Sequence, residues 1–203
     1  MGKVIVTTPR IDTTLFRPAA HKWLGLVAAV GRLSPEKNIA ALISAVAGLS
    51  WPRLWIAGDG PLHVELYALV ESVGDNRIVL LGNVPNDLVA VILSKSEYFV
   101  LPSLYDQAPK ALWEAMACAC TCIVSAQVGV VEDGVTGFLC NPTAEGIRVA
   151  LERSKNDPKR DRIAQEARRW VKKAQVVSQA GITQRSGYGA IGAPNRENAR
   201  AED

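Results

Sequence analysis

Two carboxylates, Asp106 and Glu114, stand eight positions apart within residues 101–117, the most informative stretch of the sequence. An apolar run ends before Pro102, a short polar loop follows, and Pro109 opens a segment of good helix formers. The expected order is therefore strand, loop, helix. The first acid falls in the loop and the second about one and a half turns into the helix, so both can face one cleft.

The helix that begins at Pro109 offers free backbone N–H groups and the positive end of its dipole, which together suit a phosphate group. A bound phosphate would repel neighbouring carboxylates, so Asp106 and Glu114 are better suited to bind the hydroxyls of a sugar or a ribose. The structural alternative is a strand-to-helix turn with solvated acids, because paired acids are common on helices.

A basic loop lies between another strand and helix. Residues 24–30 are continuously apolar, as expected of a strand buried on both faces of a parallel sheet, and helical spacing begins at Ile39. The loop holds Arg32, with its fork of donors, and Lys37, with its compact charge, which are complementary ways of gripping a diphosphate. Such a loop is placed for anion binding at the carboxyl edge of the sheet, although solvated basic residues are the alternative.

Strands and helices alternate along the rest of the chain. Further strands are expected at residues 4–7, 54–57, 78–81, 98–101 and 122–125, with a last short strand near Leu139, and further helices at 62–73, 88–92, 143–155 and 158–173. This alternation predicts an α/β fold with a parallel sheet of about six strands and a functional site at its carboxyl edge.

Length and composition favour one domain. The chain has 203 residues, 48% of them hydrophobic, which is enough for one substantial core. We expect a linker-like segment at residues 1–20, the domain at 21–173, and a polar tail at 174–203 that is disordered or loosely attached. The net charge of +3 does not require a nucleic-acid partner, and the few aromatic residues are not interleaved with basic runs.

The four cysteines are expected to be buried free thiols. Cys118, Cys120, Cys122 and Cys140 do not match the spacing of a zinc site, and both histidines lie far from them in sequence, so no metal is expected. No signal peptide or membrane-spanning run is present in the sequence. We therefore expect a cytoplasmic protein with reduced cysteines, and its basic face also allows peripheral attachment to a lipid surface.

The order of residues in 101–117 resembles the donor-binding motif of retaining glycosyltransferases of the two-Rossmann-domain (GT-B) architecture, in particular glycosyltransferase family 4, within glycosyl transferases group 1. The family pattern is Pro-Ser, a few residues, Glu, seven residues, and Glu-Ala-Met-Ala. Here Asp106 stands at the first Glu and Glu114 at the second. The resemblance covers roughly residues 11–171 and implies a Rossmann-like sheet with helices on both faces, the C-terminal half of such an enzyme.

The resemblance also implies roles for single residues. In the family, the first acid contacts the donor sugar, the second holds the nucleotide ribose, and a basic pair at the positions of Arg32 and Lys37 stabilises the departing diphosphate. Arg32, Lys37, Asp106 and Glu114 form the expected catalytic set. The expected donor-binding set, which includes backbone contacts to the nucleobase and the diphosphate, is Gly31, Gly82, Asn83, Val84, Ala108, Pro109, Lys110, Ala111 and Leu112.

The sequence departs from the family pattern at several points. Asp106 is one methylene shorter than glutamate, and Asn38 stands where relatives often have glycine. Residues 117–123 lack a glycine and a proline that relatives have, which changes the end of the helix rather than the chemistry. Residues 128–129 run directly into the next segment, as though a few residues were deleted, so the loop over the donor is expected to be reshaped.

The implied reaction is transfer of a sugar, with retention, from a nucleoside-diphosphate sugar to a glycan, a lipid or a small molecule, without a metal or other cofactor. The acceptor site would come from an N-terminal domain outside these 203 residues. Three arrangements stay open: a fragment of a longer enzyme, one subunit of a split enzyme, or a nucleotide-sugar-binding module without turnover. A dehydrogenase or flavodoxin-like domain is disfavoured, because the glycine-rich turn at residues 58–61 lacks the G-x-G-x-x-G order.

Overall fold

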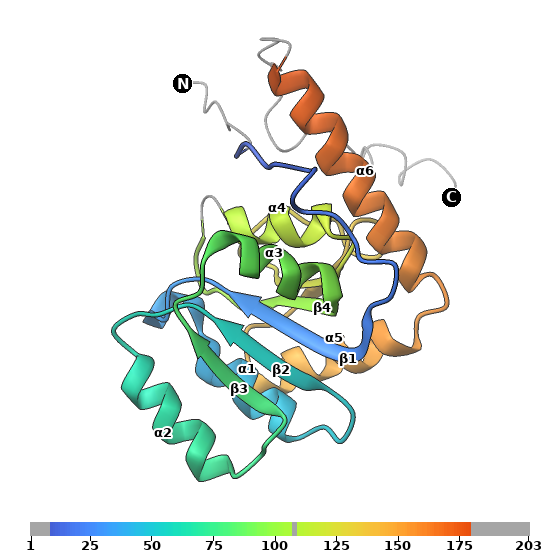
Figure 1. The fold of residues 1–203 in the computed structure, drawn as a ribbon. Helices are drawn as coiled ribbons and strands as arrows, with labels where there is room; N and C mark the ends of the chain where they lie inside the picture. The colour runs from blue at the N-terminus through green and yellow to red at the C-terminus, as the bar shows by residue number, and fades with distance from the viewer. Residues whose placement is uncertain (1–8, 107–108, 180–203) are drawn as a thin grey trace, which may run out of the picture.

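The structure, a computed structural model, describes residues 9–106 and 109–179, with side chains described as far as Ala174. In this part of the chain six strands form one parallel sheet in the order β3-β2-β1-β4-β5-β6 (Figure 1). The strands are β1 (Trp23–Val30), β2 (Arg53–Ala57), β3 (Ile78–Gly82), β4 (Ser96–Leu101), β5 (Thr121–Ser125) and β6 (Phe138–Cys140). This doubly wound order confirms the expected Rossmann-like α/β fold.

Helices cover both faces of the sheet. One face carries α1 (Ile39–Ala47), α2 (His63–Val73) and α5 (Ala144–Asn156), and the other carries α3 (Asn86–Lys95), α4 (Lys110–Ala117) and α6 (Arg160–Gln179) (Figure 1). The chain changes face after β3, when α3 crosses back so that β4 lies beside β1. The functional edge predicted from sequence is therefore the carboxyl edge near β1 and β4.

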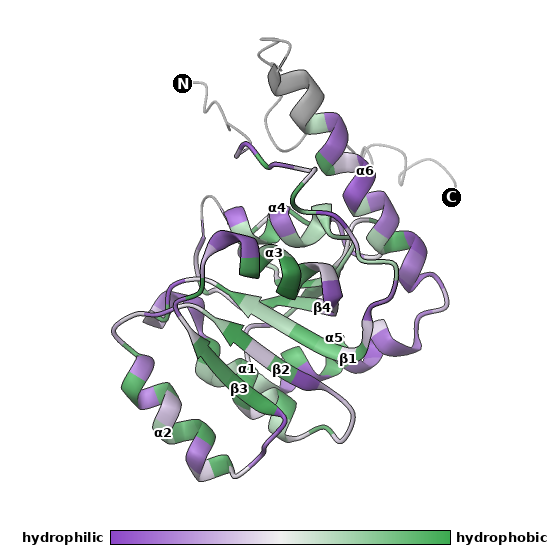
Figure 2. Ribbon diagram, viewed as in Figure 1, coloured by the Kyte–Doolittle hydropathy of each residue, from purple (hydrophilic) through white to green (hydrophobic). Residues whose placement is uncertain are grey.

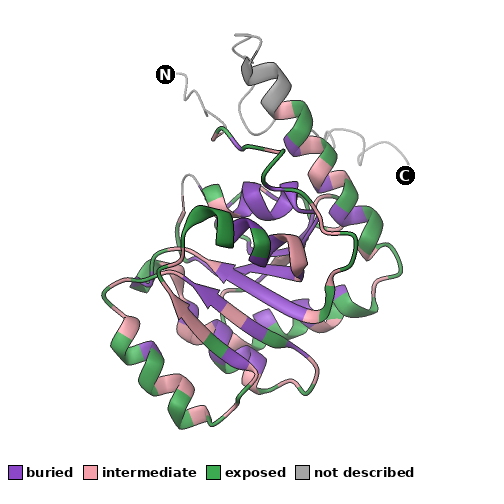
Figure 3. Ribbon diagram, in the orientation of Figure 1, coloured by how far each residue is buried: buried purple, intermediate pink, exposed green. Residues whose placement is uncertain are grey.

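The two cores follow from the alternation of side chains along central strands. In β1, Val27 and Ala29 belong to the core under α1, α2 and α5, whereas Ala28 belongs to the core under α3, α4 and α6. The same alternation holds in β4, where Tyr98 and Phe99 point to opposite cores. The middle of the sheet is buried on both faces, while α2 keeps an exposed outer side (Figure 3).

The N-terminal segment and the last helix differ from the expected domain limits. Ile11 and Phe16 are buried against the core under α4 and α6, so part of the segment expected to be a linker packs on the domain. Helix α6 continues to Gln179, so the prediction that the tail begins at residue 174 is wrong for residues 174–179. The strand expected at residues 4–7 and the rest of the expected tail, 180–203, lie outside the described residues.

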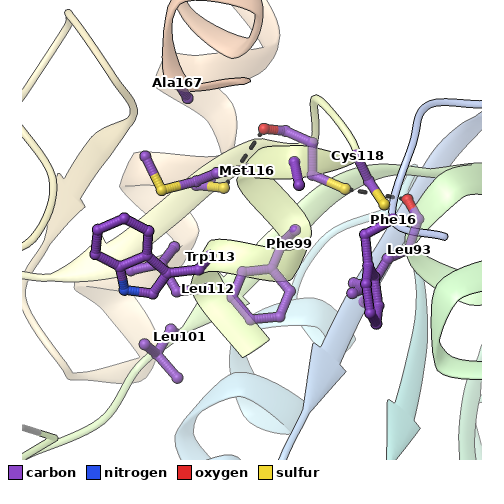
Figure 4. Close-up of a cluster of buried hydrophobic side chains, with 14 of the residues drawn as sticks. Phe16, Leu93, Phe99, Leu101, Leu112, Trp113, Met116, Cys118 and Ala167 are labelled. Atoms are coloured by element: carbon purple, nitrogen blue, oxygen red, sulfur yellow. Dashed lines mark hydrogen bonds between the residues drawn. The ribbon is translucent and has the colours of Figure 1, made fainter. Parts of the chain in front are cut away.

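Helix α6 is tied to α4 through two tryptophans. Its outer side is largely hydrophilic, whereas Ala167 and Val171 face the core (Figure 2). The rings of Trp113 and Trp170 stack with centroids 4.6 Å apart. Trp113 lies beside Leu112 in the buried cluster beneath α4 (Figure 4).

Helix α4 ends in a left-handed residue that is not glycine. Ala119 has φ of 51°. Its amide donates to the Met116 carbonyl at 2.9 Å, and the Cys120 amide donates to the Ala115 carbonyl at 3.0 Å. This is the Schellman pattern of helix ends, in which glycine is usual at the left-handed position. The loss of the family's glycine is therefore visible as backbone strain at Ala119.

The structure also shows the state of the four cysteines and whether a described helix could span a membrane. All four cysteines are free and buried, as expected, and burial raises the pKa of the Cys140 thiol to about 11. No helix in the part of the chain that the structure describes is both long and apolar enough to cross a membrane.

Candidate functional site

The predicted basic loop and the predicted acidic loop meet at the point where the strand order reverses. Strands β1 and β4 are neighbours, but the chain leaves β1 toward α1 on one face and leaves β4 toward α4 on the other. Loops that diverge in this way leave a crevice at the carboxyl edge, the usual ligand site of doubly wound sheets.

The backbone of the basic loop is fixed against the loop after β2. The Gly31 amide donates to the Ala57 carbonyl at 3.0 Å. Gly31 and Gly58 both have positive φ, of 151° and 145°. A Cβ at Gly58 would lie 1.8 Å from the Gly31 carbonyl oxygen, so only glycine permits this approach. Gly58 thus has a structural role, because it permits the close approach of these two loops.

Three further hydrogen bonds, besides the ion pair described below, connect the basic loop to the loops after β4 and β6. The Leu104 amide donates to the Glu36 carbonyl at 2.8 Å. Asn38 adopts the left-handed conformation, φ 54°, which asparagine tolerates better than most residues. Its side-chain amide donates to the Pro102 carbonyl at 3.2 Å and to the Pro142 carbonyl at 2.7 Å. Asn38 therefore makes two hydrogen bonds that a glycine at this position would lack.

Lys37 and Asp106 form an ion pair across these loops. Lys37 Nζ lies 2.5 Å from Asp106 Oδ2, and the two side chains are only 22% and 10% exposed. Arg32 is exposed and makes no ion pair or hydrogen bond through its side chain to any described residue. A small pocket is lined by Gly31, Arg32 and Lys37 from one loop and by Pro102 from the other. The structure thus brings three of the four expected catalytic residues to one crevice.

The fourth, Glu114, is buried on the inner side of α4. Its nearest charge is Lys110, with Nζ 3.0 Å from Oε1, although Oε1 accepts no hydrogen bond of normal geometry within the described structure. Burial raises the pKa of the Glu114 carboxyl, and the Lys110 ammonium opposes that rise. Asp106 and Glu114 are thus paired with different lysines, and Glu114 is the more deeply buried of the two.

The start of α4 differs in one detail from the expected anion site. Pro109 is the residue that caps the helix rather than its first residue, and the Leu112 amide donates to the Pro109 carbonyl at 2.9 Å. The Leu112 amide therefore already has an acceptor at the start of the helix. The amides of Lys110 and Ala111 stand in the first turn, where a helix provides no acceptor of its own. Ala108 lies outside the described residues.

The expected nucleobase edge, Gly82 to Val84, lies two strands away from β1 on the same carboxyl edge. The Gly58 amide donates to the Gly82 carbonyl at 2.8 Å, which aligns the ends of β2 and β3. Gly82 has φ of 67°, Asn83 is exposed, and Val84 packs against the core. Gly58 connects these three residues to Gly31, but among the described residues no hydrogen bond or ion pair joins them to Arg32 or Lys37.

The loop after β5 packs its valine side chains against the core. Val128 and Val131 are 8% and 7% exposed and belong to the core under α4 and α6, with Val130 packed against it. These valines anchor the loop to the core under α4 and α6, and its reshaping relative to the family stays a prediction.

Sequence reasoning missed three features of the site. The bridging side chain of Asn38 carried no sequence signal beyond its place after Lys37. The hydroxyl of Ser103 is buried without a hydrogen-bond partner among the described residues, which no pattern predicts. The ion pair of Lys110 with Glu114 could have been found, because a lysine and a glutamate four residues apart face each other on a helix.

No group of three or more His, Cys, Asp or Glu side chains suited to a metal ion occurs within residues 9–106 and 109–174.

The sequence of this site region is similar to a known family. Residues 16–170 match the family described as Glycosyl transferases group 1. One curated relative, Alpha-D-kanosaminyltransferase of Streptomyces kanamyceticus, is 32% identical over 153 residues, which cover 70% of this chain and 39% of the relative. The chain spans less than half the length of the curated relatives it matches.

Solved structures show the same fold. Sucrose-phosphate synthase from Thermosynechococcus elongatus is 25% identical with a TM-score of 0.75, over 88% of this chain and 51% of that one. HepE of Anabaena, in complex with UDP and glucose, is 20% identical with a TM-score of 0.72, over 86% of this chain and 55% of that one.

Proposed function

The chain belongs to the group 1 glycosyl transferases, and on that premise we propose that it is the donor-binding half of a retaining glycosyltransferase of the GT-B type. The donor would be a nucleoside-diphosphate sugar. The observation that carries the proposal is the meeting of Gly31, Arg32 and Lys37 with the loop before α4 at the point where the strand order reverses. Cationic side chains beside a helix N-terminus suit a diphosphate.

The basic pair, the buried acid and the nucleobase edge each have a chemical role in this proposal, and Asp106, which the family resemblance assigns to the donor sugar, would lie beside Lys37. Arg32 and Lys37, with the first free amides of α4, would stabilise the negative charge that grows on the diphosphate as the sugar departs. Glu114 would accept hydrogen bonds from the ribose hydroxyls once the nucleotide reaches α4. Gly82, Asn83 and Val84 would border the nucleobase. The proposed chemistry uses no metal ion and no covalent nucleophile.

We also propose that the acceptor, a glycan, a lipid or a small molecule, is held by a second Rossmann-like domain outside these 203 residues. That domain would belong either to the same polypeptide or to a partner chain. Turnover is not expected without it. Placement in the cytoplasm, with contact to a membrane surface if the acceptor is a lipid, is part of the same proposal and agrees with the four reduced cysteines.

The test is calorimetric titration of the chain with UDP, GDP, ADP and their sugar derivatives. UDP is the nucleotide in the HepE structure. One nucleotide should bind, and Arg32→Ala or Glu114→Gln should weaken it by about tenfold to a hundredfold, because each removes a charged hydrogen-bonding group. The matched control is Arg162→Ala, which removes the same charge from the exposed side of α6 and should leave affinity unchanged.

The outcome separates two functions. Binding together with turnover, once an acceptor domain is added, supports the transferase. Binding without turnover in the presence of that domain would instead identify a nucleotide-sugar-binding module. Absence of binding by a folded chain would contradict the proposed site.

A further inference from the structure

The ion pair of Lys37 and Asp106 occupies the ammonium group that a diphosphate would need. Lys37 Nζ and Asp106 Oδ2 are 2.5 Å apart, and both side chains are largely withdrawn from water. A pair that is partly buried is screened less by solvent and salt than a pair on the surface. The contact is therefore an energetic obstacle to any second anion at Lys37.

The position of Lys37 is set by the rest of the loop. Lys37 ends the short 3₁₀ turn Pro35–Lys37, and its side chain passes over Gly31, with Cε 4.0 Å from where a Cβ of Gly31 would be. It lines the same pocket as Arg32. An anion in that pocket and the Asp106 carboxylate would thus approach one ammonium group, and two anions at one lysine repel each other.

We infer that Asp106 competes with the ligand's phosphates for Lys37 and is a specificity-determining residue, an inference that rests on the proposed donor site. A free nucleoside diphosphate carries more negative charge on its terminal phosphate than the same diphosphate esterified by a sugar. Repulsion from Asp106 therefore weakens binding of the free nucleoside diphosphate more than it weakens binding of the sugar nucleotide. The ion pair of Lys37 and Asp106 therefore favours release of the nucleoside diphosphate after the sugar has left.

The shorter side chain at this position gives the inference its basis in sequence. Aspartate replaces the glutamate that the family pattern has here, and in the structure its carboxylate is bound to Lys37 rather than free to extend into the crevice. The Lys37–Asp106 pair thus has a measurable consequence, a change in the balance between binding of the donor and binding of the spent nucleotide.

The experiment is calorimetric titration of the wild-type chain and of Asp106→Asn with UDP, GDP and ADP, followed by the sugar form and the uncharged nucleoside of whichever nucleotide binds. Asp106→Asn should increase the affinity of the chain for the nucleoside diphosphate by about tenfold, equal to about 1.4 kcal/mol of binding free energy. The affinity for the sugar nucleotide should increase less, and the affinity for the nucleoside should not change. Asp161→Asn, on the exposed start of α6, removes the same charge and should change none of the affinities.

A second variant makes the test specific to the pair. In Lys37→Ala, the further change Asp106→Asn should still tighten binding of the nucleoside diphosphate, because direct repulsion between carboxylate and phosphate remains, but the gain in affinity should differ from that in the wild type, because no ammonium is left to compete for. Equal gains in the two backgrounds would exclude competition for Lys37. Unchanged or weaker binding by Asp106→Asn, with wild-type binding intact, would overturn the inference while leaving the donor site standing. Failure of both proteins to bind any nucleotide, with thermal unfolding showing that both are folded, would overturn the donor site and the inference together.

Discussion

Lys110 Nζ lies 3.0 Å from Oε1 of Glu114, four residues further along α4, and the two side chains differ in exposure, 58% against 5%. The negative charge of a buried carboxylate is therefore balanced by the ammonium group of a lysine that itself remains in water. Because Oε1 accepts no hydrogen bond of normal geometry in the described structure, the carboxylate has capacity for a ligand hydroxyl.

Glu114→Gln should stabilise the folded chain near pH 7. Burial raises the pKa of Glu114, so the native state holds this proton more tightly than the unfolded chain and ionisation above the raised pKa costs stability. The free energy of unfolding of the variant should exceed that of the wild type at pH 7. The difference should shrink as the pH falls through the raised pKa toward 4.5, as urea titrations at several pH values will show.

Lys110→Met is the companion test of the same pair. It should lower the free energy of unfolding at pH 7 by about 1 kcal/mol, because it leaves the buried carboxylate without its counter-charge, while the exposure of Lys110 limits the loss. In the Glu114→Gln background the cost should nearly vanish. An equal cost in both backgrounds would mean that the lysine acts through packing.

Gly58→Ala should destabilise the chain by about 3 kcal/mol, because a positive φ and an overlap with the Gly31 carbonyl act together. Gly129→Ala provides the control: its φ is 69°, but a Cβ there would meet nothing within 4 Å, so only about 1 kcal/mol is expected. Denaturant unfolding measures both. Equal costs would show that the contact with Gly31 relaxes freely.

Ala119→Gly and Ala115→Gly form a matched pair at the end of α4. Both remove a buried methyl group, but Ala119 is left-handed whereas Ala115 lies within the helix. The change at Ala119 should therefore be less destabilising than that at Ala115, by about 1–2 kcal/mol, since glycine relieves the strain at one site and weakens the helix at the other. Chemical denaturation of the two variants gives the difference directly. A difference near zero would exclude strain at Ala119.

Trp170→Ala should lower the free energy of unfolding by about 2 kcal/mol, through loss of the stacked pair with Trp113 and of part of the core under α6. Trp170→Phe keeps an aromatic ring and should cost roughly half as much. Tyr67→Ala, on the exposed side of α2, should cost no more than about 0.5 kcal/mol. If Trp170→Ala were as mild as Tyr67→Ala, α6 would contribute little to the fold.

The sheet could be predicted from sequence because the middle of each central strand is buried on both faces and therefore reads as a continuous apolar run, as residues 26–29 do in β1; Leu24, at the start of the predicted run, is exposed instead. The end of α6 could not be predicted in the same way. The hydrophobic period fades after Lys173, but a helix already formed continues at little cost through residues such as alanine and glutamine.

The positions of three candidate site residues in the fold could be predicted, but their contacts could not. Arg32, Lys37 and Asp106 were placed correctly at the carboxyl edge because the fold dictates where loops after parallel strands meet. That Lys37 would hold Asp106, 69 positions away, depends on the relative register of β1 and β4 and on the shape of both loops. The covered position of Glu114 depends equally on how α4 sits against the sheet, which helical spacing alone does not specify.

Asn38 has a consequence for recombining this chain with its relatives. Its side chain binds carbonyls 64 and 104 positions away, at the ends of the loops that precede α4 and α5. A chimera that exchanges residues around α5 between family members must therefore keep the Pro142 carbonyl within hydrogen-bonding distance of the Asn38 side chain. Otherwise the basic loop loses one of the hydrogen bonds that hold it in place. Crossover points are best chosen so that residues 38, 102 and 142 come from the same parent.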